Sequence, residues 1–250
     1  MRWKRGTVLT ALIIIAALAL AAAWGRATMA HDGWRSASRE SAGIAPDPAT
    51  TSEAVVQVYA ARAWGWRGSF GVHSWIAVKP TGAPAFDVYE VIGWRAYRGM
   101  SALSISNRPA DGRWFGNLPE LIAEMRDDGV DAVIARIDTA ARAYPHAKEY
   151  RVWPGPNSNT FTAFVARAIP ELRVDLPPTA IGKDYLPNGD IVATTPSGTG
   201  FQFSLFGLFG ILVGVEEGLE VNLLGLTFGI DPVDPALKLP IVGRLGPNRG

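Results

Sequence analysis

Residues 153–161 read Trp-Pro-Gly-Pro-Asn-Ser-Asn-Thr-Phe and join a predicted short strand, residues 150–153, to a predicted helix. The two prolines and the glycine between them predict a tight, rigid turn. Apolar side chains then recur at helical spacing from about residue 158 to residue 169, and Pro170 ends the pattern. Ser158 therefore falls in the first turn of the helix, where its hydroxyl projects toward whatever that helix packs upon.

The start of this helix suits a nucleophile. Unpaired backbone N–H groups at a helix N-terminus favour negative charge, including a developing oxyanion. Ser158 is therefore a candidate catalytic nucleophile, with Asn157 as a supporting residue. The alternative is structural, because Asn and Ser are preferred N-cap residues and capping alone accounts for their presence. The sequence leaves both interpretations open.

A serine nucleophile needs a base, and His73 is the candidate. It lies in a predicted strand over residues 72–78, which a turn joins to a predicted strand over residues 86–94. In a hairpin that pairs Lys79 with Phe86, Glu90 lies diagonal to His73, about 7–8 Å away. A carboxylate behind the histidine and a hydroxyl before it would satisfy the logic of a catalytic triad. A slip of one residue would move Glu90 to the other face, and a half-buried histidine bonded to backbone is the alternative.

Three further residues are candidates for binding a ligand. Arg95 and Arg98 could clamp an anionic group, although an exposed cluster at the end of a strand is the more ordinary interpretation. Trp153 is one of 9 tryptophans, several of which flank Gly or Arg. Such aromatic residues, when they line a groove, suit glycan binding or a membrane interface, while core filling is the default. The glutamates at 216, 217 and 220 could hold a cation, but solvation of a turn is favoured.

The N-terminus predicts a membrane address. Arg2, Lys4 and Arg5 precede an uncharged run over residues 6–24, which at roughly 1.5 Å per residue would span a bilayer. The basic side remains in the cytoplasm under the positive-inside rule, so the rest of the chain is exported. We expect a single-pass anchor in a bacterial inner membrane, with the C-terminal domain in the periplasm or outside the cell. A cleavable signal peptide is the alternative, because small residues at 28–30 offer a cleavage site.

The chain divides into three predicted segments. Residues 1–30 are the anchor or signal peptide, residues 31–52 form a linker rich in Ala, Ser and Pro, and residues 53–250 form a single domain. Within that domain we expect strands at 55–59, 72–78 and 86–94, then helices at 118–125 and 130–141. An antiparallel sheet with helices makes the fold class α+β.

The last part of the domain, residues 198–250, is apolar and rich in glycine. Residues 201–215 and 219–230 are expected to form a hairpin with its turn at 216–218. We favour a core position for this hairpin, and the alternative is an exposed surface against a membrane or a partner.

Composition excludes several kinds of function. The 250 residues include no cysteine, which excludes disulfides, a thiolate nucleophile and cysteine-ligated metal centres. A net charge of +1 argues against a nucleic-acid partner held by bulk electrostatics. With 3 histidines there is little material for a metal site, so no metal and no cofactor are expected.

Four motifs resemble a known family. Residues 72–76, 153–161, 218–226 and 236–240 together resemble the bacterial family called domain of unknown function 3750, over roughly residues 55–245. The order of a histidine strand and a later helix opened by an Asn-nucleophile pair is more loosely similar to circularly permuted papain-like proteins, the NlpC/P60 and lecithin–retinol acyltransferase group. That resemblance implies a permuted papain-like fold, with Asn157-Ser158 at the place of an Asn-Cys pair and His73 at that of the histidine.

The replacement of cysteine by serine divides the functional expectation. A thiol beside a histidine exists partly as thiolate, whereas a serine hydroxyl must lose its proton during the attack. One expectation is an amide or ester hydrolase acting on cell-envelope material, in which Ser158 attacks, His73 is the base, and Glu90 or Asn157 supports them. The other is a non-catalytic envelope module that binds a ligand or serves as a scaffold.

Overall fold

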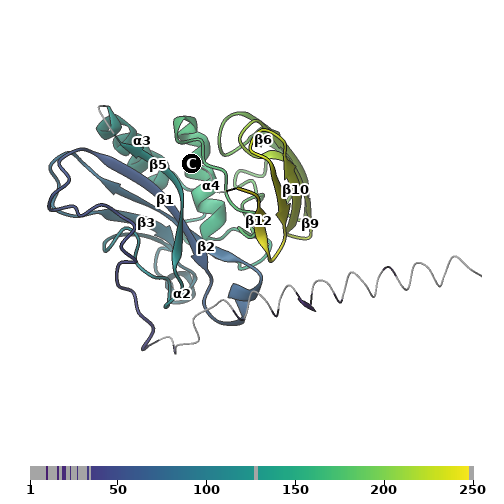
Figure 1. Ribbon diagram of the computed structural model, residues 1–250, viewed down its shortest axis with the longest axis horizontal. Coiled ribbons are helices and arrows are strands. Elements are labelled where there is room, and N and C mark those ends of the chain that lie inside the picture. Colours follow the sequence, from purple (N-terminus) through teal and green to yellow (C-terminus); the bar gives the residue numbers. More distant parts are fainter. Residues whose placement is uncertain are drawn as a thin grey trace, which may run out of the picture.

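The chain folds into two antiparallel β-sheets that lie on either side of a central helix (Figure 1). This computed structural model describes residues 35–126 and 129–247, together with residues 10, 16, 19, 20, 23, 27 and 33. Most of the regular structure in these residues is β-strand.

The first sheet has five strands in the order β4-β3-β2-β1-β5. Its elements, with the short helices that connect them, are β1 (Val55–Arg62), η1 (Gly65–Ser69), β2 (Val72–Lys79), β3 (Asp87–Val91), α2 (Gly93–Tyr97), β4 (Leu103–Asn107) and β5 (Pro119–Arg126). Two longer helices, α3 (Val130–Arg142) and α4 (Ser158–Ala168), follow it and precede the short η2 (Pro170–Leu172).

Both faces of the five-stranded sheet are buried. Alternate residues of its strands, such as Val58 and Ile76, pack with α3 and α4 in one core through side chains such as Phe161. The opposite face carries Tyr59 and Trp75 in a second, smaller core. His73 belongs to that second face, because side chains two residues apart on a strand point the same way.

The second sheet has seven strands in the meander order β12-β11-β10-β9-β8-β7-β6. They are β6 (Val192–Thr194), β7 (Gly200–Leu205), β8 (Phe209–Gly214), β9 (Gly218–Leu223), β10 (Leu226–Asp231), β11 (Ala236–Leu239) and β12 (Gly243–Leu245). Neighbouring strands are antiparallel and short turns join them, so the pairing is local in sequence.

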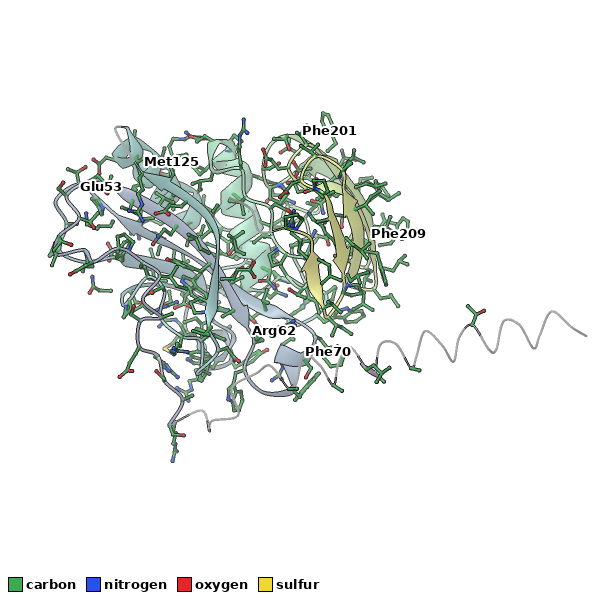
Figure 2. All side chains as sticks on the ribbon, in the orientation of Figure 1. Glu53, Arg62, Phe70, Met125, Phe201 and Phe209 are labelled. Carbon is green, nitrogen blue, oxygen red and sulfur yellow. The ribbon has the colours of Figure 1, made fainter. Side chains whose placement is uncertain are left out.

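This sheet has its polar face inward and its apolar face outward. In β7, β9 and β10 most buried positions are polar, as at Gln202 and Asn222, whereas β8 buries Gly210 and Leu212. The alternating positions of these four strands are mostly apolar and exposed or half-buried. In Figure 2 the side chains of the sheet project on the side away from α4, where Phe201 and Phe209 are labelled. The usual pattern for a sheet in water is the reverse.

A cluster of buried charges fills the inner side. Lys238 Nζ donates to Asp175 and Glu220 at 2.8 Å, and Lys183 Nζ donates to Asp184 at 3.1 Å and also to Glu220. All five side chains are less than a tenth exposed. Buried charges are tolerated when they are paired in this way, so the cluster ties the sheet to the segment that precedes it.

The predicted fold class is wrong. We expected an α+β, permuted papain-like domain with an N-terminal transmembrane helix, whereas the described residues form two antiparallel sheets with few helices. No helix among the described residues is long and apolar enough to cross a membrane. Most of the run over residues 6–24 lies outside those residues, so the membrane contact at 6–24 and the inner-membrane location are not tested and stay predictions.

Two local predictions account for much of the error. Residues 118–125 were expected to be helical, but residues 119–125 belong to β5, where they pair with β1 at the edge of the sheet. A short apolar run fits both periods, and the tertiary pairing decided it. Residues 201–230 were expected to be one core hairpin, but they form four strands with an exposed face, and Glu217 and Glu220 are buried.

The buried charge cluster predicts a specific loss of stability. Burial alone would raise the pKa of Glu220, but Lys183 and Lys238 hold it below its ordinary value. Glu220→Gln leaves both ammonium groups short of a counter-charge and is expected to cost about 3–5 kcal/mol in urea unfolding. Glu171→Gln, which breaks the exposed ion pair with Arg136, is the matched control and should cost about 0–1 kcal/mol.

The same pair gives a pH test of this prediction. A depressed folded-state pKa stabilises the protein above the unfolded pKa, and that contribution is lost as pH falls through the folded value. The stability difference between wild type and Glu220→Gln should therefore shrink on acidification. A difference that is small at neutral pH would contradict the role assigned to the cluster.

Candidate functional site

One large cavity opens where the first sheet, the start of α4 and the second sheet meet. Its volume is about 920 Å³, and β2 and the first turn of α4 contribute Val72, His73 and Ser158 to its lining. Aromatic side chains form a large part of its wall, including those of Trp64, Trp66, Trp94, Tyr97, Trp114 and Trp153. Three arginines, Arg39, Arg67 and Arg98, complete the charged part of the lining.

The start of α4 is fixed by Asn157. Its Oδ1 accepts from the backbone N–H groups of Asn159 and Thr160, and Thr160 Oγ1 accepts from the Asn157 N–H at 3.1 Å, which makes a capping box. Asn157 is thus the N-cap and Ser158 is not. Two of the first-turn donors that we expected to stabilise an oxyanion are consequently already used.

The other side of Asn157 holds two loops. Its Nδ2 donates to the carbonyls of Val152 at 3.1 Å and Ile181 at 3.0 Å. The loop that contains Ile181 can come this close to Asn157 because residue 182 is a glycine with a φ of +95°. A Cβ at residue 182 would lie 2.3 Å from Asn157 Nδ2. The cavity wall at Ile181 is therefore set by the same side chain that caps α4.

The hydroxyl of Ser158 lies beside that of Tyr150 and partly offsets the rise that burial causes in the pKa of the tyrosine. Both side chains line the cavity. Burial raises the pKa of Tyr150 to about 12, so the phenol stays protonated at neutral pH. The site therefore presents a pair of neutral hydroxyls at the N-terminus of α4.

His73 is held by a carboxylate and a guanidinium. Its Nε2 lies 2.8 Å from Glu90 Oε2, and Arg108 Nε donates to Glu90 Oε1 at 3.2 Å. The ring of His73 stacks on Trp114, with centroids 3.7 Å apart and planes 13° apart. The sequence predicted this partner, because β2 and β3 pair in the assumed register.

The electrostatics favour a neutral His73 beside an ionised Glu90. Burial lowers the pKa of His73, and the hydrogen bond and charge of Glu90 only partly offset that shift. Burial would raise the pKa of Glu90, but His73 and Arg108 bring it below its ordinary value. An ionised carboxylate only accepts hydrogen bonds, so Nε2 carries the proton and Nδ1 is the basic nitrogen. No residue in the described part of the chain hydrogen-bonds to Nδ1.

The structure separates the predicted site residues. It brings His73, Ser158, Asn157, Arg98 and Trp153 to one cavity, with Glu90 directly behind the histidine. Arg95 does not line the cavity, and its Nε donates to the Ser101 carbonyl at 2.8 Å. His73 and Ser158 share the cavity, but no hydrogen bond joins these two described residues.

Four residues of the site were missed. Arg108 follows β4 and reaches Glu90, Tyr150 meets Ser158, Trp114 stacks on His73, and Arg67 lines the cavity. All four lie in loops or in the short η1, where no periodic pattern marks a direction. The many tryptophans and arginines in the sequence were the one available signal, but their number does not show which of them reach the site.

The cap assignment predicts different costs for two neighbouring substitutions. Asn157→Ala removes the cap of α4 and the donors to two carbonyls, so it should destabilise the fold by about 2–4 kcal/mol. Ser158→Ala removes one hydroxyl from the cavity lining and leaves the cap of α4 in place, so it should cost about 1 kcal/mol or less. Thermal and urea unfolding of both variants measure this, and equal costs would show that Ser158 is also a structural cap.

Comparison with known proteins places the chain in a family. No curated protein and no solved structure matches it, and nothing supports the looser likeness to permuted papain-like proteins. A family model described as a protein of unknown function (DUF3750) matches residues 53–185, which include the first sheet, α3, α4 and most of the residues that line the cavity. This match covers more than half of the sequence, so the chain belongs to the DUF3750 family.

Proposed function

We propose that the cavity binds an anionic amphiphile, a molecule with a long apolar part and a negatively charged head. The observation that carries this proposal is the lining, in which apolar and aromatic side chains surround about 920 Å³ with few polar groups. Small-molecule sites of roughly 300–1,000 Å³ have this character, and this cavity is at the upper end of that range. A large apolar volume suits an acyl chain better than a compact polar metabolite.

The charge of the lining selects the head group. Arg39, Arg67 and Arg98 line the cavity, and no carboxylate is among the described residues that do so. Arg39 lies over the ring of Phe115 and Arg67 over the ring of Trp66, at 4.4 and 5.2 Å from the centroids. No described residue pairs with the guanidinium of Arg98. A phosphate or carboxylate head would supply the missing counter-charge.

The source of such a ligand follows from its chemistry. Lipids and lipid-linked material of a cell envelope combine acyl chains with anionic heads, which agrees with the location expected from the sequence. The proposal thus narrows the expected envelope-binding module to one class of ligand.

Arg98 and Arg95 provide a matched test, because both belong to α2 or its C-cap and only Arg98 lines the cavity. Palmitoyl lysophosphatidylglycerol, titrated by calorimetry, should bind the wild type more tightly than the zwitterionic palmitoyl lysophosphatidylcholine. Arg98→Gln should weaken the anionic ligand about tenfold, since a charge-assisted hydrogen bond contributes roughly 1.5–3 kcal/mol. Arg95→Gln should leave the affinity unchanged. Equal effects of the two variants, or equal affinity for both ligands, would contradict the proposal.

A second candidate is hydrolysis of an ester or amide in that ligand, and the geometry of His73 favours it. The Glu90 pairing leaves Nδ1 as a neutral base on a side chain that lines the cavity. In this mechanism Nδ1 takes the Ser158 hydroxyl proton while Oγ attacks the carbonyl carbon. The protonated histidine then gives its proton to the leaving group, and water releases the acyl group from the serine. Ser158 must first turn its hydroxyl from the side of Tyr150 toward His73, which lines the same cavity.

Labelling with a fluorophosphonate tests this second candidate. The wild type should react, Ser158→Ala should abolish the reaction, and His73→Gln should slow it at least about a hundredfold. Ser101→Ala is the control, because Ser101 does not line the cavity. Labelling that survives Ser158→Ala, or no labelling of the wild type, would refute hydrolysis by Ser158 and leave the binding proposal intact.

The pH dependence of the labelling rate identifies the base. The rate should fall as pH drops through the pKa of His73, which burial holds below its ordinary value of about 6.5. Glu90→Gln removes a charge that raises this pKa, so the fall should move to still lower pH. A fall at or above about pH 6.5 would mean that another group is the base.

A further inference from the structure

The outward face of the seven-stranded sheet is apolar from β7 to β12. We call it the outer face, and its central rows are formed by Phe201, Val213, Leu219, Ile230, Leu237 and Leu245 and by Phe203, Ile211, Val221 and Phe228. No charged side chain occupies these described positions. Most of these residues are among the exposed large hydrophobic side chains of the protein. An exposed surface of this kind is rare on a protein that stays in water.

Two hairpin tips at one end of the outer face carry large apolar side chains in an unfavourable backbone conformation. Phe206, after β7, and Leu224, after β9, have φ values of 52° and 55°, and each is followed by a glycine with positive φ. They are 65% and 66% exposed, so no core contact requires their size. Asn or Asp is the preferred residue at such a position, and the left-handed conformation costs a bulky residue roughly 1–2 kcal/mol. Strain that supports no internal packing indicates a role outside the molecule.

The Leu224 tip adjoins the cavity. Leu224 and Leu226 line the cavity themselves, and Trp153 Nε1 donates to the Leu224 carbonyl at 2.9 Å. Trp66 and Trp153 line the same cavity and are more than half exposed. The apolar outer face therefore continues into a rim of exposed tryptophans and cavity-lining arginines. Tryptophan is enriched at the interface of membranes, and arginine attracts anionic lipid heads.

We propose that the outer face and the Phe206 and Leu224 tips dock the protein on a lipid bilayer that contains anionic lipid. The uncharged outer face contacts the acyl region, and the tips enter it at the end where Leu224 lines the cavity. Arg67 and Arg98, which line that cavity, then lie toward the head groups, and the charges are complementary. If a second copy of the chain covered the outer face, one arrangement would bring the arginine-bearing ends of the two molecules together, which is electrostatically unfavourable. The other arrangement would leave the strained tips without a contact. A bilayer is therefore the better occupant.

The buried cluster explains how such a face stays outward. Lys183 and Lys238 lie on the inner side of the sheet with their carboxylate partners. Turning the sheet over would put the apolar rows inside and move Glu220 and Lys238 away from Lys183 and Asp175, which would break the ion pairs that join the sheet to the preceding segment. The orientation of the face is thus fixed by the fold and needs no contact with lipid to form.

The absence of cysteine from the chain allows a direct test on the full-length protein. Phe206→Cys and Leu224→Cys are labelled with bimane and incorporated into vesicles of phosphatidylcholine and phosphatidylglycerol that carry doxyl-labelled acyl chains. Both labels should lose fluorescence relative to vesicles without doxyl. Val233→Cys is the control, because Val233 is equally exposed but lies in the turn after β10, at the opposite end from the Leu224 tip. Phe206 does not line the cavity, so quenching of its label reports contact with acyl chains independently of ligand binding at Arg98.

A double substitution distinguishes docking through the two tips from attachment of the protein to the vesicle through another part of the chain. Phe206→Asn with Leu224→Asn suits the left-handed backbone and keeps the fold, and it should abolish the quenching of a bimane at Ile211→Cys on the outer face. Quenching at the tips no greater than at Val233→Cys would overturn the proposal. The solvent exposure of the Ile211→Cys label is also measured without lipid. If it falls as the protein concentration rises, a second copy of the chain covers this face instead of a bilayer.

Discussion

The arrangement of this protein depends on the buried pairing of Lys183 and Lys238 with Asp175, Asp184 and Glu220. Each charge is removed from water and is tolerated only with its partners in place. The cluster binds the inner side of the second sheet to the segment before it. A sheet held by its polar side must show its other side to the surroundings, and that side is apolar.

The same segment also shapes the cavity. Next to Lys183, the carbonyl of Gly182 accepts from Thr160 Oγ1 at 2.7 Å, and the carbonyl of Ile181 accepts from Asn157 and Asn159. The charge cluster, the start of α4 and the cavity wall are therefore successive contacts of one stretch of chain. Because the cavity and the outer face share this stretch, the fold fixes the position of one relative to the other. We therefore place the opening of the cavity at the end of the sheet that carries the Leu224 tip and meets the membrane.

The sequence predicted the local features that a short stretch determines. The helix from Ser158 and the turn before it agree with the structure, because capping chemistry and prolines act within a few residues. The pairing of His73 with Glu90 followed from a hairpin register. Neither required knowledge of the rest of the chain.

What failed needed long-range information. An alternation of apolar and polar residues shows that a strand has two faces, but it does not say which face is inward, so residues 201–230 were assigned to the core. The inward side was decided by lysines and carboxylates far apart in sequence, such as Asp175 and Lys238. Arg108 and Tyr150 reached the site from loops in the same way.

The most direct test of the account is a crystal structure of the protein with palmitoyl lysophosphatidylglycerol. It should show the palmitoyl chain of the ligand among the cavity tryptophans and the phosphate of the ligand at Arg98. A cavity that stays free of lipid at saturating ligand, with the phosphate bound elsewhere, would contradict it.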